Sequence, residues 1–130
     1  MEAATMPKKV LVVDDDPDMR EAISMLIKIA LPEVIIVEAE NGEEAQSILD
    51  SSATAIGAVV TDFDFRVECG ITGLDLIDWV RQKYPGIPIL LCSAHPLEGE
   101  AEEFIRKPFS IEDFNNIFNQ LIAKIKKPAI

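Results

Sequence analysis

The sequence predicts an α/β fold, in which a doubly wound, five-stranded parallel sheet carries helices on both faces. The length of 130 residues fits one domain. Short, continuous apolar runs, typical of strands buried on both faces, alternate along the chain with stretches of helical periodicity. Strands that alternate with helices form parallel sheets, and right-handed crossovers leave few topologies for them.

The first strand and the first helix follow each other directly. Val10–Val13 is a continuous apolar run, and Asp14, Asp15, Asp16 and Pro17 come next. Asp16 is a typical N-cap, and proline suits the first position of a helix. Apolar residues then recur at helical spacing until Pro32 ends the helix; they are Met19, Ala22, Ile23, Leu26 and Ala30.

The middle of the chain repeats this pattern twice. Two further apolar runs predict strands, each followed by a segment that predicts a helix. Asn41-Gly42 and Pro85-Gly86 are the breaks in this part of the chain. The expected elements are, in order, the strand Val34–Val37, the helix Glu43–Leu49, the strand Ala55–Thr61 and the helix Leu74–Lys83.

The last third of the chain has two predicted strands but room for only one full helix. Ile87–Cys92 and Phe104–Arg106 are the strands, and Ser110 caps the last helix. Only residues 94–106 separate Ser93 from Lys107, and the fifth strand with its turns uses much of that length. The helix between the fourth and fifth strands is therefore expected to be short, irregular or absent.

Composition and charge argue against several classes of protein. The chain is 48% hydrophobic and 27% charged, unlike a disordered or collagen-like chain. Its net charge of −11 repels nucleic-acid phosphates and anionic membranes, so neither is an expected partner. No apolar run approaches the roughly 18–20 residues that span a bilayer, and residues 1–9 have no signal-peptide core. A cytoplasmic location is expected.

Polar side chains stand where the predicted strands end. They are, in chain order, Asp14, Asp15, Asp62, Asp64, Ser93 and Lys107. In an open parallel sheet, sites form at the carboxyl ends of the strands. Clustered carboxylates repel one another, and a Mg²⁺ ion bound by oxygen ligands relieves that repulsion. An aspartate beside Mg²⁺ and a lysine can accept a phosphoryl group, because both cations neutralise charge on the transferring oxygens.

Four motifs at these strand ends resemble those of the response regulator receiver domain, in the CheY-like superfamily. They are Val12-Val13-Asp14-Asp15, Thr61-Asp62, Leu91-Cys92-Ser93-Ala94 and Arg106-Lys107-Pro108-Phe109. The resemblance covers residues 8–126, which leaves residues 1–7 and 127–130 as tails. It implies a flavodoxin-like (βα)₅ fold. It also implies Mg²⁺-dependent transfer of a phosphoryl group from a histidine kinase or a phosphotransfer protein.

The resemblance implies a role for each residue at the site. Asp62 is the implied phosphoacceptor and a Mg²⁺ ligand. Asp15 is expected to bind Mg²⁺ directly, Asp14 mainly through water, and Asp64 through its backbone carbonyl. Lys107 is expected to pair with the phosphoryl group.

The resemblance also implies a conformational switch. Ser93 and Phe104 stand where the family has its switch hydroxyl and its switch aromatic, and the Lys107–Pro108 bond is expected to be cis. A downstream protein partner would read the switch. The chain would then be a phosphoacceptor signalling domain that catalyses only its own phosphorylation and dephosphorylation. It is expected to be a stand-alone receiver or one excised from a longer protein, with its oligomeric state left open.

Two departures from the family pattern keep other interpretations open. The loop Phe63–Thr72 is about three residues longer than usual, with Phe65-Arg66 in place of the usual Met-Pro, and the fourth helix is reduced. Both favour a pseudo-receiver, an interaction module that works without phosphate, whereas Asp62 and Lys107 oppose it. A remote third interpretation is a small DxD-type phosphatase, since Asp62-Phe63-Asp64 resembles the haloacid-dehalogenase motif. The order of the motifs argues against that enzyme class.

Overall fold

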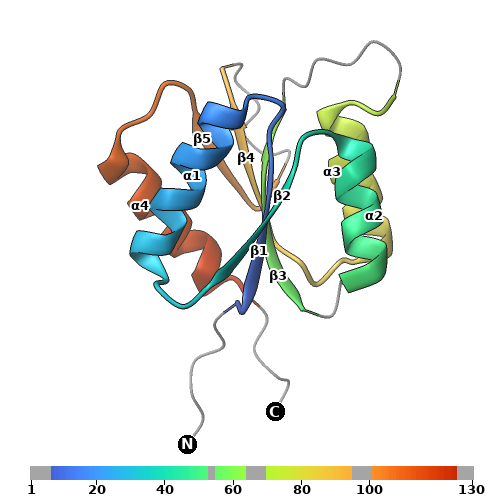
Figure 1. Cartoon of the computed structure of the whole chain (residues 1–130), viewed down its shortest axis with the longest axis horizontal. Coiled ribbons are helices and arrows are strands. Elements are labelled where there is room, and N and C mark those ends of the chain that lie inside the picture. Colours follow the sequence, from blue (N-terminus) through green and yellow to red (C-terminus); the bar gives the residue numbers. More distant parts are fainter. Residues whose placement is uncertain (1–6, 53–54, 64–69, 95–100, 126–130) are drawn as a thin grey trace, which may run out of the picture.

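The computed structural model describes residues 7–52, 55–63, 70–94 and 101–125. Five parallel strands form one sheet in the order β2-β1-β3-β4-β5, and α1 and α4 lie on the opposite face from α2 and α3 (Figure 1). The predicted α/β fold is confirmed. The elements are β1 (Lys9–Val13), α1 (Pro17–Ala30), β2 (Ile35–Ala39), α2 (Gly42–Ser52), β3 (Ile56–Asp62), α3 (Gly73–Lys83), β4 (Ile89–Ser93), β5 (Glu103–Arg106) and α4 (Ile111–Ala123).

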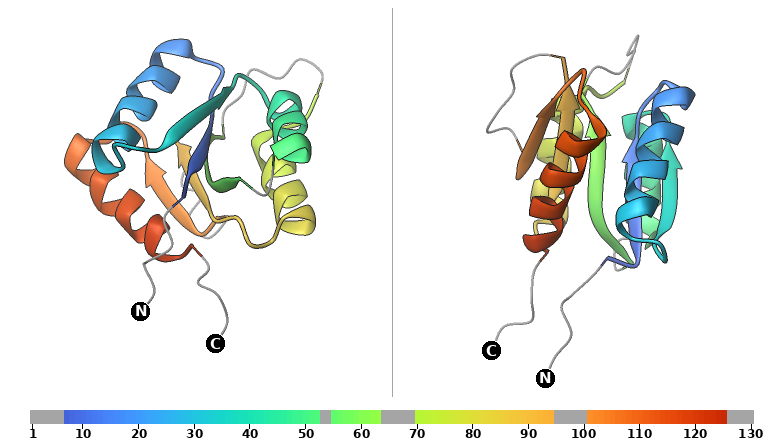
Figure 2. Two further views of the ribbon diagram at one scale, coloured as in Figure 1. Left: turned by 60° about the horizontal axis from the view of Figure 1, so that its bottom comes forward. Right: turned by 90° about the vertical axis from the view of Figure 1, so that its left-hand side faces the viewer.

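Each face of the sheet has its own hydrophobic core, because successive side chains of a strand point to opposite faces. Val10 and Val12 pack in the cluster that contains Phe114 and Phe118 of α4. Leu11 packs in the second cluster, with side chains of α2 and α3. Figure 2 shows the two helical layers on either side of the sheet. The continuous apolar run of β1 is thus explained by burial on both faces.

The predicted helix caps are confirmed. The side chain of Asp16 accepts a hydrogen bond of 3.0 Å from the Asp18 N–H, and Pro17 is the first residue of α1. The Ser110 hydroxyl accepts a hydrogen bond of 2.9 Å from the Asp113 N–H at the start of α4. These caps satisfy donors at helix ends that have no partner within the helix.

Strand pairing shifts several predicted boundaries. The predicted strand Val34–Val37 is observed as Ile35–Ala39, because β2 pairs with β1 over its whole length, from Lys9↔Ile35 to Val13↔Ala39. The predicted helix Glu43–Leu49 is longer at both ends, as α2 runs from Gly42 to Ser52. The other strands move by one or two residues, and Asp62 becomes the last residue of β3, paired with Cys92. Hydrophobic runs locate strands, but the neighbouring strand sets where they begin and end.

Residues 94–102 connect β4 to β5, and the described part of this connection contains no helix. Residues 95–100 lie outside the described residues. The Glu102 carboxylate accepts a hydrogen bond of 2.9 Å from the Ile89 N–H, and Lys124 Nζ donates one of 2.8 Å to the Glu102 carbonyl. Lys124 also forms an ion pair with Glu103. These contacts hold the start of β5 to β4 and to the end of α4.

No helix in the described part of the chain is long and apolar enough to cross a membrane.

Candidate functional site

Three carboxylates meet at the C-terminal edge of the sheet, between the neighbouring strands β1 and β3. Asp14 and Asp15 follow β1 directly, and Asp62 ends β3. One oxygen atom from each carboxylate lies within 4.8 Å of the others. Asp14 and Asp62 are buried, and Asp15 is partly buried. This is the point in a doubly wound sheet where the connections diverge and a crevice forms.

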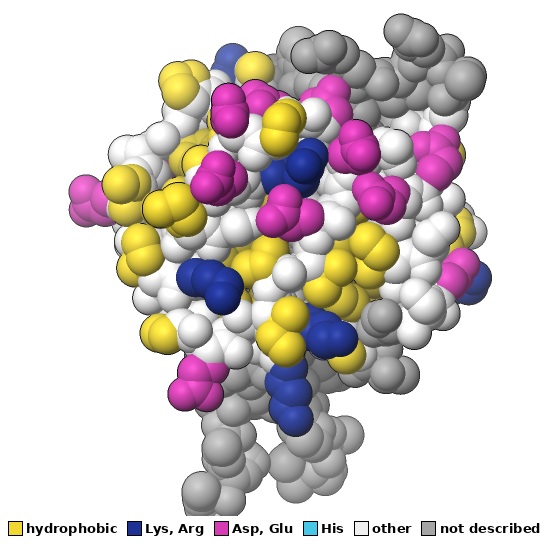
Figure 3. Space-filling model, in the orientation of Figure 1, with side chains coloured by type: hydrophobic (Ala, Val, Ile, Leu, Met, Phe, Trp, Pro, Cys, Tyr) yellow, Lys and Arg dark blue, Asp and Glu magenta, His cyan; other side chains and the backbone are white. Residues whose placement is uncertain are grey.

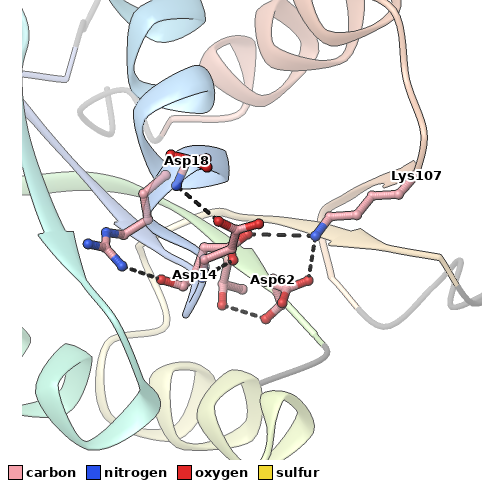
Figure 4. Close-up of polar contacts among 7 residues, drawn as sticks. Asp14, Asp18, Asp62 and Lys107 are labelled. Atoms are coloured by element: carbon pink, nitrogen blue, oxygen red, sulfur yellow. Dashed lines mark hydrogen bonds and ion pairs between the residues drawn. The ribbon is translucent and has the colours of Figure 1, made fainter. Parts of the chain in front are cut away.

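Lys107 reaches the carboxylates from the connection between β5 and α4. Its Nζ donates a hydrogen bond of 2.9 Å to Asp62 Oδ1 and lies 3.6 Å from Asp14 Oδ2 (Figure 4). The Lys107 N–H donates a hydrogen bond of 2.8 Å to the Ser93 carbonyl, and the Lys107–Pro108 peptide bond is cis, as the resemblance implied. Burial opposes the charge of Lys107, but the hydrogen bond and charges of the aspartates outweigh it and raise the pKa of Lys107.

The negative charge of the Asp14 carboxylate is poorly stabilised by its surroundings. Burial raises the pKa of Asp14, and the nearby charge of Asp62 raises it further, although the Asp16 N–H donates a hydrogen bond that lowers it. Asp14 Oδ2 is buried and has no hydrogen-bond partner among the described residues. A buried carboxylate oxygen without a donor, facing two more carboxylates, suits a hard divalent cation with oxygen ligands. The residues present therefore fit Mg²⁺.

Asp14→Asn is expected to stabilise the metal-free protein at neutral pH and to raise its Tm by a few degrees. The raised pKa means that the folded state binds the Asp14 proton more tightly than the unfolded state does. The stability that this proton contributes to the wild type is therefore lost as the pH rises through the pKa of Asp14 in the folded state. Asparagine carries no titrating proton, so the variant lacks this pH dependence. Thermal unfolding in the presence of a chelator, across the acidic range up to neutral pH, measures both effects. Equal pH profiles for the two proteins would contradict the prediction.

Ser93 and Phe104 lie on the two strands beyond β3. Ser93 is buried at the end of β4, and in the sheet register it stands opposite Arg106 of β5. Phe104 stands opposite Leu91 and is half-buried against the core formed with α2 and α3. The structure therefore places Ser93 at the carboxyl edge of the sheet and Phe104 further back along β5. Asp64 and Arg66 lie outside the described residues.

The sequence analysis missed Arg20 and Glu38. Arg20, in the first turns of α1, donates a hydrogen bond of 2.8 Å from Nη1 to the Asp14 carbonyl. It donates a second one of 2.9 Å from Nε to the Glu38 carboxylate on β2. No motif marks these two residues, because their meeting depends on the pairing of β1 with β2. The available signal was the position of Arg20 in the first turn of the predicted helix that follows the Asp14-Asp15 pair.

A family profile described as the response regulator receiver domain matches residues 10–119. The chain belongs to this family. Receiver domains are signalling domains that interact with histidine kinases and downstream effectors, and they bind Mg²⁺ through a cluster of aspartates. In this chain Asp14, Asp15 and Asp62 form a group of neighbouring aspartates. None of the similarities found supports a small DxD-type phosphatase.

Curated relatives carry receiver domains within longer chains. This receiver domain is 31% identical over 102 residues to FleR, a response regulator protein of Pseudomonas aeruginosa, covering 78% of this chain and 20% of FleR. It is 29% identical over 111 residues to a cyclic di-GMP phosphodiesterase of Thermotoga maritima, covering 79% of this chain and 28% of the relative. The chain thus spans less than a third of the length of these relatives.

Solved receiver structures share the fold. The response regulator TrrA of Thermotoga maritima, crystallised in complex with Mg²⁺-BeF, matches with a TM-score of 0.75 and 28% identity, covering 88% of this chain and 98% of TrrA. A response regulator receiver protein of Pseudomonas putida matches with a TM-score of 0.71 and 28% identity, covering 91% and 99%. The expectation of a flavodoxin-like receiver fold is confirmed.

Proposed function

We propose that this receiver domain, residues 8–126, accepts a phosphoryl group on Asp62 in a Mg²⁺-dependent reaction with a histidine kinase or a phosphotransfer protein. The observation that carries the proposal is the convergence of four charged groups. Carboxylate oxygens of Asp14, Asp15 and Asp62 lie within 4.8 Å of one another, and Lys107 Nζ lies 2.9 Å from Asp62 Oδ1. Buried or partly buried carboxylates beside a partly buried ammonium at such separations are typical of sites that stabilise transferring phosphoryl oxygens.

The residues divide the chemistry among them. Asp14, Asp15 and Asp62 would hold Mg²⁺, which supplies positive charge for the phosphoryl oxygens. A carboxylate oxygen of Asp62 attacks phosphorus and the P–N bond of the donor's phosphohistidine breaks. The leaving imidazole nitrogen takes the electron pair of that bond and is protonated from solvent. Lys107 then donates to a phosphoryl oxygen in place of Asp62 Oδ1. Asp64 lies outside the described residues, so its backbone carbonyl stays a predicted ligand.

Ser93 and Phe104 are proposed to report the phosphoryl group to a protein partner. The Ser93 hydroxyl lies on β4, between the strand that ends in Asp62 and the strand that leads to Lys107. We expect it to donate a hydrogen bond to a phosphoryl oxygen and so to favour one of two arrangements of β4 and β5. Phe104, half-buried on β5, is positioned to change its packing with that shift.

Intact-mass spectrometry after incubation with acetyl phosphate or phosphoramidate tests the proposal. We expect an added mass of one phosphoryl group that requires Mg²⁺ and is absent from Asp62→Ala. Asp50→Ala is the matched control, because Asp50 is an exposed carboxylate paired with Lys83 away from the site. An adduct on Asp62→Ala would contradict the assignment of the acceptor. A folded wild-type chain that takes up no phosphoryl group from either donor would favour the pseudo-receiver.

A further inference from the structure

Arg20 ties together three segments at the edge of the sheet. Its own N–H bonds to the Asp16 carbonyl at 2.9 Å, which anchors the residue in α1. Its guanidinium donates from Nη1 to the Asp14 carbonyl, after β1, at 2.8 Å and from Nε to Glu38, on β2, at 2.9 Å. The Arg20 side chain is only 19% exposed, so most of it is shielded from solvent.

The carbonyl held by Arg20 belongs to the peptide unit that joins Asp14 to Asp15. Because this unit is planar, holding its oxygen sets the plane and the direction in which the chain enters Asp15. The Asp14 N–H bonds to the Ala39 carbonyl at 3.1 Å, and the Asp16 N–H bonds to Asp14 Oδ1 at 2.9 Å. Together these contacts orient the Asp14 side chain and the backbone that carries Asp15.

Glu38 gives the guanidinium a partner away from the three carboxylates. Acidic side chains gather over the upper part of the molecule in Figure 3, the edge at which α1 and α2 begin. Exposed members of this group among the described residues include Asp16, Asp18, Glu40 and Glu44. A mobile guanidinium in this region would be drawn to any of these carboxylates. The bond from Nε to Glu38 on β2 holds it in place and neutralises its charge.

We propose that Arg20 is a positioning residue for the cation at this site, held in place by Glu38. The proposal rests on the Mg²⁺ site of the proposed function. Arg20 acts through the Asp14–Asp15 peptide and not by touching the cation. Groups that orient metal ligands in this way commonly change metal affinity when they are replaced.

Titration of the full chain with Mg²⁺ alone, followed by the NMR amide signals of Asp15 and Asp16, tests this role. We expect Arg20→Lys and Arg20→Gln each to weaken Mg²⁺ binding about tenfold. Lysine keeps the charge but lacks the planar pair of donors that serves a carbonyl and a carboxylate together. If Arg20 acted only through its charge, Arg20→Gln would bind Mg²⁺ more tightly and Arg20→Lys would be unchanged. That result would overturn the proposal.

Two further variants test whether the change in Mg²⁺ affinity is specific to the Arg20–Glu38 contact. Lys83→Gln removes another cation from an ion pair, the 2.8 Å contact with Asp50, and is expected to leave Mg²⁺ affinity unchanged. Glu38→Gln is expected to weaken Mg²⁺ binding less than Arg20→Gln does, and the double variant is expected to bind as Arg20→Gln does. Additive losses would show that the two residues act independently and would overturn the proposed unit.

The same titrations distinguish this inference from the proposed function. Thermal unfolding of each variant measures stability separately from affinity. Arg20 variants that lose stability but keep wild-type Mg²⁺ affinity when folded would show a purely structural role and would overturn the inference alone. A folded wild-type chain that binds no Mg²⁺ would overturn both the inference and the proposed function.

Discussion

Replacing Lys107 with methionine is expected to slow phosphoryl transfer to Asp62 by about 10²-fold or more, as is typical when one charge-stabilising donor is removed. Lys107 Nζ is 2.9 Å from Asp62 Oδ1 and is therefore close to the oxygens of a phosphoryl group on that side chain. Methionine keeps an unbranched, flexible side chain but supplies neither charge nor donor. The initial rate of phosphoryl uptake at saturating Mg²⁺, measured by intact-mass spectrometry, gives the effect.

Lys124→Met is the control for this variant. Lys124 forms its ion pair with Glu103 at the start of β5, whereas Lys107 follows the end of that strand. The control is expected to keep the wild-type rate, since the contacts it loses, the ion pair with Glu103 and the hydrogen bond to the Glu102 carbonyl, lie at the opposite end of β5 from Lys107. A Lys107→Met rate within a factor of about two of the wild-type rate would show that the donor contributes little to the transition state.

Lys107→Met is also expected to bind Mg²⁺ more tightly than the wild type. In the structure Lys107 Nζ supplies positive charge to Asp62 Oδ1 at 2.9 Å and to Asp14 Oδ2 at 3.6 Å. Without that ammonium the carboxylates repel more strongly, and a divalent cation relieves more repulsion on binding. The amide titration with Mg²⁺ measures this affinity. Weaker binding would mean that Lys107 orders the carboxylates more than it competes with the cation.

Truncating Phe114 to alanine is expected to lower the free energy of unfolding by about 3–5 kcal/mol, the usual cost of deleting a buried phenyl ring. Phe114 is fully buried, with ring centroids of Phe109 and Phe118 at 5.7 Å and 5.6 Å. It holds α4 on the face of the sheet that α1 also covers. Total stabilities of small domains are about 5–15 kcal/mol, so the variant is expected to be close to unfolding.

Urea denaturation of three variants checks this prediction. Phe114→Leu keeps most of the apolar volume and is expected to lose less stability than Phe114→Ala. Ile111→Ala lies in the same helix, but Ile111 is 63% exposed, so a change within about 0.5 kcal/mol is expected. A loss below about 1 kcal/mol for Phe114→Ala would show that α4 is not anchored by this ring.

Much of the fold could be predicted because the local sequence pattern of each element matches its surroundings in the folded chain. The run Val10–Val13 is apolar at every position because both sides of β1 are covered. Asp16 and Ser110 are good N-caps in isolation, and both act as N-caps in the structure. The predicted ends of strands and helices were less accurate. The first and last residues of β2, for example, are set by its pairing with β1.

The residues that make up the candidate site could be predicted from the sequence. Asp14, Asp15, Asp62 and Lys107 each stand directly at or after a predicted strand, and parallel strands bring their carboxyl ends to one edge of a sheet. The electrostatic balance at the site was not predictable. It depends on how deeply Asp14 is buried and on which oxygen Lys107 reaches, and both follow from the packing of neighbouring strands.

The order of the elements, their helix caps and the charged groups that lie at the C-terminal edge of the sheet can all be predicted from the sequence alone. These features follow from local periodicity and from residue chemistry, which a single chain displays directly. Which of those groups are in contact depends instead on how the strands and helices pack. Arg20 meets Glu38, 18 residues further along the chain, because β2 pairs with β1, the strand from which the chain enters α1.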